Sequence, residues 1–477
     1  MHALPRTRCG PPKSYRSVHH ADLDRPVDET VVLVTPSRTP PSGIDRRILA
    51  LAVPSLGALV AEPAFVLADS VIVGRLGTEP LAGLTVASTL LMTVVGLCVF
   101  LAYATTATVA RLVGAGDRPR ALAAGVDGAW LAAGIGLVLA AVIWAAAPWA
   151  AAVLGASGDV LVHATSYLRW SAPGLPGMLV VLAATGSLRG VEDTRTPLVV
   201  AATGAVVNVG LNLAFVYGAG MGIAGSALGT ALSQTGMGVA LAVVLARGAR
   251  RHGVGLRPTT AGVLAGARTG MPLFVRTLSL RLAILLTVTV AAQLGDVNLA
   301  AHQVVSSVWG FAALVLDALA IAAQVIVGQA VGQRSVELAR AFLRRSIGWG
   351  LGVGVVLGAV VGGCSWWISA AFTTETPVRA AITAGLVAAA VFMPLGGYVF
   401  LLDGVLIGAG DGRYLAVVGM LTLVVYAPAA FAVAAWAPAG PAGLAWLWVA
   451  FAGVFMAARA ATTWWRVRTD AWMNAVA

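Results

Sequence analysis

Long apolar segments, each of about 20 residues or more, recur along nearly the whole chain and are separated by short polar connections. A helix needs about 20 apolar residues to cross the hydrocarbon core of a bilayer, where its backbone hydrogen bonds must be satisfied internally. The pattern therefore predicts an all-α integral membrane protein with about twelve transmembrane helices. The predicted spans are residues 48–74, 83–110, 121–147, 160–188, 197–217, 222–246, 264–293, 300–331, 341–368, 378–408, 414–436 and 442–465.

Composition agrees with a membrane protein. Of the 477 residues, 59% are hydrophobic and 11% are charged, whereas soluble domains carry about 25% charged residues. The 56 glycines suit close helix packing in lipid. The formal net charge of +11 does not indicate nucleic-acid binding, because the basic residues stand at segment ends rather than in one patch.

Arginine is concentrated in alternate connections and near the two ends of the spanning region. By the positive-inside rule both termini are cytoplasmic, in a multi-pass protein of the cell (inner) membrane. The other connections contain only Arg75 and Arg379. The arginines on the predicted cytoplasmic side are Arg46, Arg47, Arg111, Arg118, Arg120, Arg189, Arg195, Arg247, Arg250, Arg251, Arg257, Arg268, Arg334, Arg340, Arg344, Arg345, Arg413, Arg466 and Arg468.

The two halves of the chain repeat. Pro54 aligns with Pro272 at an offset of 218 residues, the difference between their numbers, and the same offset pairs Asp193 with Asp411. An offset that covers about six spans predicts two pseudo-symmetric six-helix lobes related by an axis along the membrane normal, with a central cleft between them. The predicted organisation is a disordered cytoplasmic tail (1–45), a first lobe (46–247), a linker (248–263), a second lobe (264–468) and a C-terminal tail (469–477).

The first 45 residues are polar and rich in proline and arginine, without helical periodicity. They lack the apolar core and small-residue cleavage site of a secretory signal. Two interpretations stay open, a disordered tail or a translation start placed too far upstream.

Two acids, Glu62 and Asp69, interrupt the first span, and Pro63 stands between them. A charged carboxylate at a helix centre costs about 2.5–3.5 kcal/mol on insertion scales, so the neutral acid is favoured there and a proton binds readily. The two positions are two helical turns apart on one face, and Pro63 weakens the helix beside them. We predict a proton-driven coupling role for Asp69 and Glu62 with a helix kink at Pro63. The alternative is a static hydrogen-bonded acid that joins helices.

Polar residues at membrane depth also mark other spans. Asn208 and Asn212 stand one turn apart in the fifth span, where they would hold the proton of Asp69, coordinate a cation or join helices. The second half carries a further polar set, for which we predict an ion pair of Arg276 or Arg281 with Asp317, or a role in the substrate cavity. This set is Arg276, Arg281, Asp317 and Gln324.

Several classes of function are excluded by what the sequence lacks. Lys13 is the only lysine, so no Walker A motif exists and the chain cannot be its own ATPase. No HExxH motif, CxxC pair or clustered acids are present, and we expect no catalytic residues, no metal site and no organic cofactor.

The sequence resembles the multidrug and toxic compound extrusion (MATE) family, in its DinF-like branch. The resemblance implies export of organic, often cationic, compounds by two lobes that rock between two states in exchange for H⁺ or Na⁺. We expect the chain to act as a monomer. It implies a cation-binding role for Asp69, with Asn208 and Asn212 as its polar partners. Because Asn212 is an amide where some relatives have an acid, we favour H⁺ over Na⁺ coupling. The resemblance rests on IDRRILALAVPSLGALVAEPAFVLADSVIVGRLGTEPLAG (44–83), ARLVGAGD (110–117), SLRGVEDTRTP (187–197), AAHQV (300–304), LDALAIAAQVIVGQAVG (316–332) and LLDGVLIGAGD (401–411).

Four alternatives remain beside a proton-coupled exporter. These are a Na⁺-coupled member of the same family, a lipid-precursor flippase, a major-facilitator exporter and a non-catalytic membrane scaffold. The segment ARLVGAGDRPR fits the major-facilitator loop motif poorly. A flippase would favour a strongly cationic cavity, and a scaffold would not explain acids confined to one half of a repeat.

Overall fold

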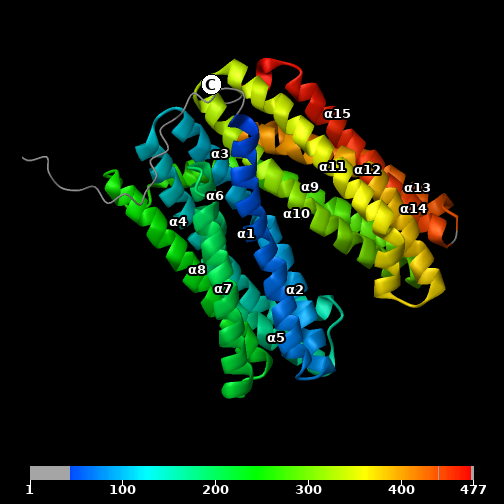
Figure 1. The fold of residues 1–477 in the computed structure, drawn as a ribbon. Coiled ribbons are helices and arrows are strands. Elements are labelled where there is room, and N and C mark those ends of the chain that lie inside the picture. Colours follow the sequence, from blue (N-terminus) through cyan, green and yellow to red (C-terminus); the bar gives the residue numbers. More distant parts are fainter. Residues whose placement is uncertain (1–42, 439, 474–477) are drawn as a thin grey trace, which may run out of the picture. The chain divides into compact units, whose positions relative to one another are not determined.

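Twelve helices long and apolar enough to cross a membrane are present in the computed structural model, which describes residues 43–438 and 440–473. Their number and order confirm the predicted spans, and most ends extend a few residues beyond the predicted ones (Figure 1). Three of the twelve spans consist of two helices each, namely α2 with α3, α5 with α6 and α14 with α15. The helices are α1 (Ile44–Gly74), α2 (Thr78–Cys98), α3 (Phe100–Gly114), α4 (Arg118–Val153), α5 (Gly158–Ser171), α6 (Leu175–Gly190), α7 (Arg195–Leu213), α8 (Ile223–Arg251), α9 (Thr260–Gln293), α10 (Asp296–Gly332), α11 (Val336–Phe372), α12 (Thr376–Ala409), α13 (Gly412–Trp436), α14 (Pro441–Trp448) and α15 (Met456–Val467).

The predicted boundaries between segments shift slightly. Most of the predicted N-terminal tail lies outside the described residues, but α1 already begins at Ile44. The predicted linker is shorter, since α8 continues to Arg251 and α9 begins at Thr260. In the predicted C-terminal tail, residues Asp470–Trp472 form a short 3₁₀ turn, and Asp470 pairs with Arg340 at 2.5 Å.

The structure confirms the repeat at the level of helix ends. The second span runs from Thr78 to Gly114 and the eighth from Asp296 to Gly332, a displacement of 218 residues at both ends. Both spans follow a glycine with positive φ, Gly77 at +133° and Gly295 at +96°. Such a backbone conformation is accessible to glycine at little steric cost, so the same sharp turn occurs in each half.

Side-chain caps repeat in the same way. Asp117 precedes α4 and accepts a hydrogen bond from the backbone N–H of Arg120 at 3.1 Å. Ser335 stands at the equivalent position before α11 and accepts from the N–H of Leu338 at 3.4 Å. Each cap satisfies one of the unpaired donors at a helix start.

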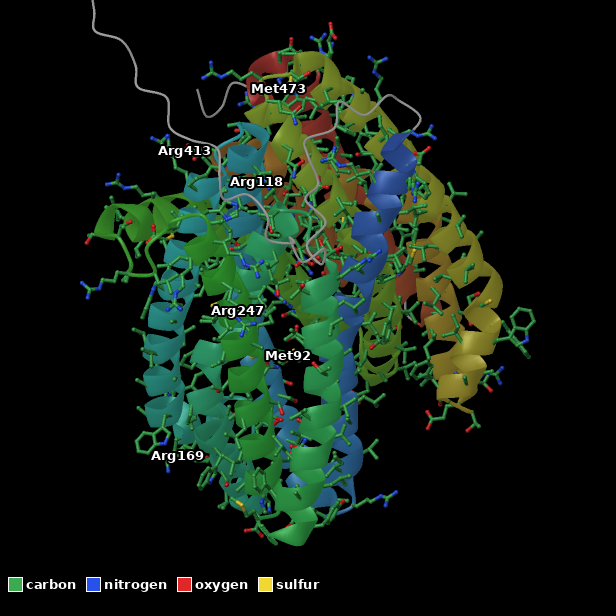
Figure 2. The ribbon with its side chains drawn as sticks, turned by 60° about the vertical axis from the view of Figure 1, so that its left-hand side comes forward. Met92, Arg118, Arg169, Arg247, Arg413 and Met473 are labelled. Carbon is green, nitrogen blue, oxygen red and sulfur yellow. The ribbon has the colours of Figure 1, made fainter. Side chains whose placement is uncertain are left out.

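The arginine-rich connections define one end of the bundle, which we call the basic end. It holds the start of α1, where Asp45 pairs with Arg345, and the connection after α12, where Asp411 accepts a hydrogen bond from Arg466 at 2.5 Å. Arg118 and Arg413 lie at this end and Arg169 at the other, as Figure 2 shows.

The two halves meet through α10, which packs against α1 and α3, and through α3, which also packs against α12. At the basic end the backbones of α3 and α10 touch. A Cβ added at Gly114 would lie 2.7 Å from the carbonyl carbon of Gln329, and one added at Gly332 would lie 2.8 Å from that of Arg111. Gly114 and Gly332 are equivalent in the repeat, as are Arg111 and Gln329, so this contact has pseudo-two-fold symmetry.

Two hydrogen bonds across the same contact are also equivalent. The Arg111 Nη1 donates to the carbonyl oxygen of Gly408 at 3.1 Å, and the Gln329 Nε2 donates to that of Gly190 at 3.4 Å. We call these bonds, with the glycine contacts, the symmetric closure. Arg47 strengthens it by donating to the Gln329 Oε1 at 2.5 Å. The basic end is therefore closed in this conformation.

Candidate functional site

Asp69 lies inside the first half, 4% exposed, and is surrounded by uncharged partners. Tyr167 of α5 and Thr230 of α8 each donate a hydroxyl hydrogen bond to its Oδ2 at 3.1 Å. Asn212 of α7 donates its amide N–H to the Oδ1. No ion pair to Asp69 exists within residues 43–438 and 440–473, so the acid is held by neutral donors alone.

The two predicted asparagines lie in the same cluster. The Asn208 Nδ2 donates to the Thr230 hydroxyl at 3.0 Å, and the Asn212 Nδ2 lies 3.4 Å from the Asn208 Oδ1. Both amides are fully buried. We call Asp69, Tyr167, Asn208, Asn212 and Thr230 the Asp69 cluster.

The equivalent positions in the second half are uncharged. Thr287 stands where the first half has Asp69, and Tyr426 stands where it has Asn208. Their hydroxyl groups share a hydrogen bond of 2.6 Å. The repeat therefore preserves a polar link between the two helices but not the acid.

A central cavity of about 1080 Å³ lies between the halves and is lined by residues of both. From the first half it is lined by α1, including Glu62, Pro63 and Ser70. From the second half it is lined by α9, α10 and α12, and by aromatic residues such as Trp309 and Phe451. A cavity of this size and apolar character suits a drug-sized organic molecule.

The structure separates the two acids of the first helix. Glu62 lines the cavity, whereas Asp69 lies in the cluster with α5, α7 and α8 and is not part of the lining. Their shared helix face, predicted from the seven-residue spacing, therefore does not bring them into one site. Pro63 lines the cavity within α1, which continues as a helix to Gly74.

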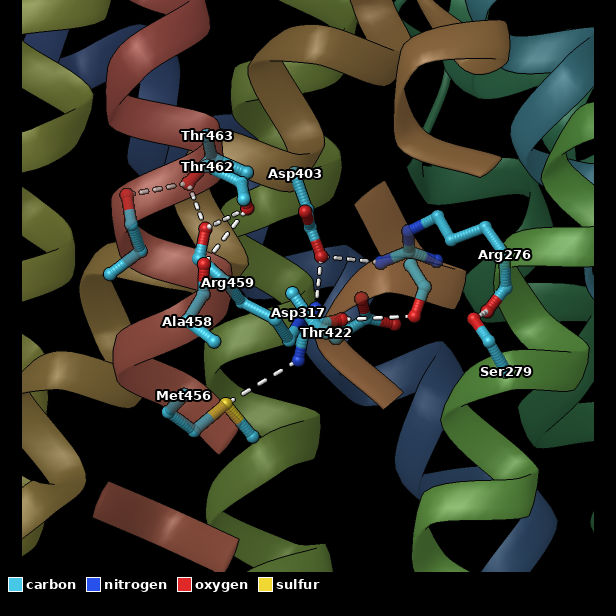
Figure 3. Close-up of polar contacts among 12 residues, drawn as sticks. Arg276, Ser279, Asp317, Asp403, Thr422, Met456, Ala458, Arg459, Thr462 and Thr463 are labelled. Carbon is cyan, nitrogen blue, oxygen red and sulfur yellow. Dashed lines mark hydrogen bonds and ion pairs between the residues drawn. The ribbon is translucent and has the colours of Figure 1, made fainter. Parts of the chain in front are cut away.

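The second half buries a different acid. Asp403 of α12 pairs with Arg276 of α9 at 2.6 Å and with Arg459 of α15, as Figure 3 shows. We call these three residues the Asp403 cluster. The prediction that Arg276 or Arg281 pairs with Asp317 is wrong, because Asp403 receives Arg276 and Arg281 forms no ion pair within the described part of the chain.

Asp317 instead accepts hydrogen bonds of 3.2 and 3.3 Å from the Tyr103 hydroxyl of α3. Gln324, two turns further along α10, donates its Nε2 to the Tyr103 carbonyl at 2.8 Å. Both residues line the cavity and link α10 to the first half. All four predicted residues of the second half therefore line the cavity. Arg276 forms an ion pair, Asp317 and Gln324 form hydrogen bonds, and Arg281 forms neither within the described part of the chain.

Three important partners were missed from sequence. Tyr167 and Thr230 stand among other polar residues of their segments, such as Ser166 and Ser233, and nothing in their spacing points to Asp69. Arg459 carried a signal, since an arginine at membrane depth requires a partner.

Two six-helix repeats around a central cavity define a membrane transporter. The chain belongs to the MatE family, whose model matches residues 54–214 and again residues 272–432. The two matches are displaced by 218 residues at both ends, which is the offset of the structural repeat. Members of this family are secondary transporters, and the chain is a transporter rather than an enzyme.

Relatives cover most of the chain. It is 31% identical to Protein DETOXIFICATION 44, chloroplastic, of Arabidopsis thaliana over 90% of this chain and 84% of the relative. It is 28% identical to DNA damage-inducible protein F of Escherichia coli (strain K12) over 76% and 81%. A crystal structure of MATE in the bent conformation matches with a TM-score of 0.82 at 22% identity, over 91% of this chain and 97% of that chain. At that identity the likeness supports the fold.

Proposed function

We propose that the chain exports organic, predominantly cationic compounds in exchange for H⁺, and that Asp69 takes up and releases the proton. The observation that carries this proposal is a buried acid whose partners are all uncharged, on a helix that also lines the cavity. Such a carboxyl can lose its charge without leaving a buried arginine unpaired. Burial away from water favours the neutral form, and the three donors stabilise the charged form.

The amide of Asn212 suits both protonation states. Its amino group donates to the carboxylate, while its Oδ1 is buried without a hydrogen-bond partner. The orientation of an asparagine amide is assigned from its hydrogen bonds, and rotation by half a turn presents the oxygen instead. A protonated Asp69 then donates to the Asn212 Oδ1.

Proton binding would act on the cavity through α1. Protonation weakens the bonds from α5, α7 and α8 to Asp69, so α1 is free to move against them. Pro63 contributes no backbone N–H, which makes that part of α1 easier to bend. Bending there displaces the cavity wall, expels or excludes substrate and favours the opposite-facing state.

The membrane orientation follows from charge. We place the basic end in the cytoplasm, with both termini on that side of the cell membrane. The conformation with the symmetric closure is then the outward-facing one, from which substrate is released. A single chain contains both halves of the cavity, so we propose that it acts as a monomer.

The cavity charge disfavours a lipid-precursor flippase, for which a strongly cationic cavity is expected. Three acidic and three arginine side chains line this cavity, so its formal charge is balanced. They are Glu62, Asp317, Asp403, Arg276, Arg281 and Arg459.

Transport in proteoliposomes tests the proposal. Purified wild type and Asp69→Asn are compared for movement of a fluorescent organic cation, ethidium, driven by a proton gradient or by a sodium gradient of equal size. We expect transport with the proton gradient only, and a fall to background in Asp69→Asn. A sodium-driven wild type would identify Na⁺ as the coupling ion, and gradient-driven transport by Asp69→Asn would remove Asp69 from the mechanism.

A further inference from the structure

Most charged groups in the central cavity already have a partner. Asp403 is paired with two arginines, and Asp317 accepts hydrogen bonds from Tyr103. Glu62 and Arg281 are different, since neither forms an ion pair or hydrogen bond within residues 43–438 and 440–473. They carry opposite formal charges and line the same cavity.

The repeat places these two residues on paired helices of the two halves. Glu62 of α1 is equivalent to Leu280, and Arg281 of α9 is equivalent to Pro63, so they stand at adjacent repeat positions on the paired helices α1 and α9. Both line the cavity. The Arg281 guanidinium reaches toward the first half, because a Cβ added at Gly96 of α2 would collide with it.

We propose that Glu62 and Arg281 form a two-point site for zwitterionic organic compounds, in which a cationic group binds Glu62 and an anionic group binds Arg281. This inference rests on the proposed export function and narrows its substrate class. The apolar part of the compound lies between the charges, against side chains such as Leu67, Trp309 and Phe451, which line the same cavity.

The physical reason is desolvation. A charge in an apolar cavity is poorly solvated, and a ligand that brings an opposite charge offsets that cost with a charge-assisted hydrogen bond. A simple cation can satisfy Glu62 but leaves Arg281 unpaired. A zwitterion satisfies both groups, and because one residue belongs to α1 and the other to α9, it contacts residues of both halves at once.

Binding to purified protein in detergent tests the site with three matched probes. They are 4′-(aminomethyl)biphenyl-4-carboxylic acid, its methyl ester, which is a cation, and its N-acetyl derivative, which is an anion. Affinity is measured by calorimetry at fixed pH for wild type, Glu62→Gln and Arg281→Gln. Arg75→Gln, which removes an exposed arginine at the end of α1, is the control.

We expect the zwitterion to bind wild type at least about tenfold more tightly than either derivative, the effect of one charge-assisted bond. Arg281→Gln should remove that advantage over the ester, and Glu62→Gln should remove the advantage over the N-acetyl derivative. The double variant Glu62→Arg with Arg281→Glu should restore preference for the zwitterion, bound in reverse. Equal affinity of wild type for the zwitterion and its ester, or equal losses for all three probes in Arg281→Gln, would overturn the proposal.

This measurement separates the two proposals. Binding in detergent involves no ion gradient, and Asp69 does not line the cavity. Preference for the zwitterion in Asp69→Asn supports the two-point site whatever ion drives transport. If wild type shows no preference for the zwitterion, the two-point site is wrong, and the proposal of proton-driven export is unaffected.

Discussion

The Asp69 cluster and the Asp403 cluster each bury one aspartate within the membrane region, but the two acids have opposite partners. Asp69 accepts hydrogen bonds from two hydroxyls and an amide, whereas Asp403 is paired with two arginines. An acid held by neutral donors can gain a proton at modest cost. An acid between two buried cations keeps its charge, because neutralisation would leave both arginines unpaired. One cluster is thus suited to change charge and the other to hold two helices against α12.

The acid suited to change its charge lies in the first half of the repeat, and the permanently paired acid lies in the second. Asp69 is equivalent to Thr287, and Asp403 is equivalent to Thr185. Arg276 and Arg459 are equivalent to Ala58 and Leu241, so neither cluster has a charged counterpart. The two halves remain alike at the basic end, where the symmetric closure uses equivalent residues. The two halves are therefore alike in the helix contacts at the basic end and differ in the buried acids within the membrane region.

Removing the charge of Asp403 is expected to have the largest effect on stability. Asp403→Asn leaves Arg276 and Arg459 buried without a counter-ion, and breaking a buried pair costs about 3–5 kcal/mol. Thermal unfolding in detergent should therefore occur at a clearly lower temperature than in wild type. Asp69→Asn should lower it far less, because an amide can keep hydrogen bonds to the same neutral partners.

A triple variant controls this comparison. Arg276→Met, Asp403→Leu and Arg459→Met together remove every charge of the cluster, and apolar replacement of a buried ionic group is often neutral or stabilising. It should recover much of the stability lost in Asp403→Asn. If Asp403→Asn unfolds together with Asp69→Asn, the proposed contrast between the clusters is wrong.

The fold could be predicted from sequence more completely than the site. Apolar segments and the 218-residue repeat depend on patterns that run along the chain, so the spans and the two halves followed directly. The grouping of Asn208 with Asn212 could be predicted, because residues one turn apart lie on the same face of a helix and this spacing is a local property. Arg276 pairs with Asp403 in a cluster that also contains Arg459, more than 180 residues further along the chain. No local sequence pattern determines whether a buried arginine reaches Asp317 or Asp403. Gly114 and Gly332 gave no signal among 56 glycines until the backbone contact was known.

The close approach at the basic end predicts the next largest effect. Gly332→Val places side-chain atoms where α10 meets the backbone of α3, and overpacking typically costs about 1–3 kcal/mol. That cost falls on the closed conformation alone, so the closed population and the transport rate should fall about tenfold or more. Initial rates in proteoliposomes measure this.

Gly348→Val is the matched control for this prediction. Gly348 lies exposed on α11 with open space around it, so a side chain there has no neighbour to displace. By symmetry Gly114→Val should behave like Gly332→Val. Normal transport by both variants would show that the helices need not approach this closely during the cycle.

Tyr167→Phe tests whether the neutral donors tune proton binding at Asp69. The variant removes one of three hydrogen bonds to the carboxylate, worth about 1 kcal/mol, and leaves the protonated acid less affected. The proton is then bound at higher pH, so the half-maximum of the transport–pH profile should move upward by about half to one pH unit. Tyr426→Phe removes a hydroxyl bonded to Thr287, where no acid is present, and should leave the profile in place. A shift of equal size in both variants would contradict a specific role for the Asp69 cluster.

Arg111→Gln should have the smallest effect, because it makes the two halves more alike. Gln329 already performs the equivalent task, donating to the Gly190 carbonyl as Arg111 donates to that of Gly408. A glutamine at position 111 can therefore keep one hydrogen bond across the closure, and the initial transport rate should stay within about twofold of wild type. Arg111→Ala removes the bond, worth about 1 kcal/mol, and should slow transport about fivefold. If Arg111→Gln is as slow as Arg111→Ala, the guanidinium itself is required, and the closure is symmetric in backbone geometry but not in the chemistry of its two donors.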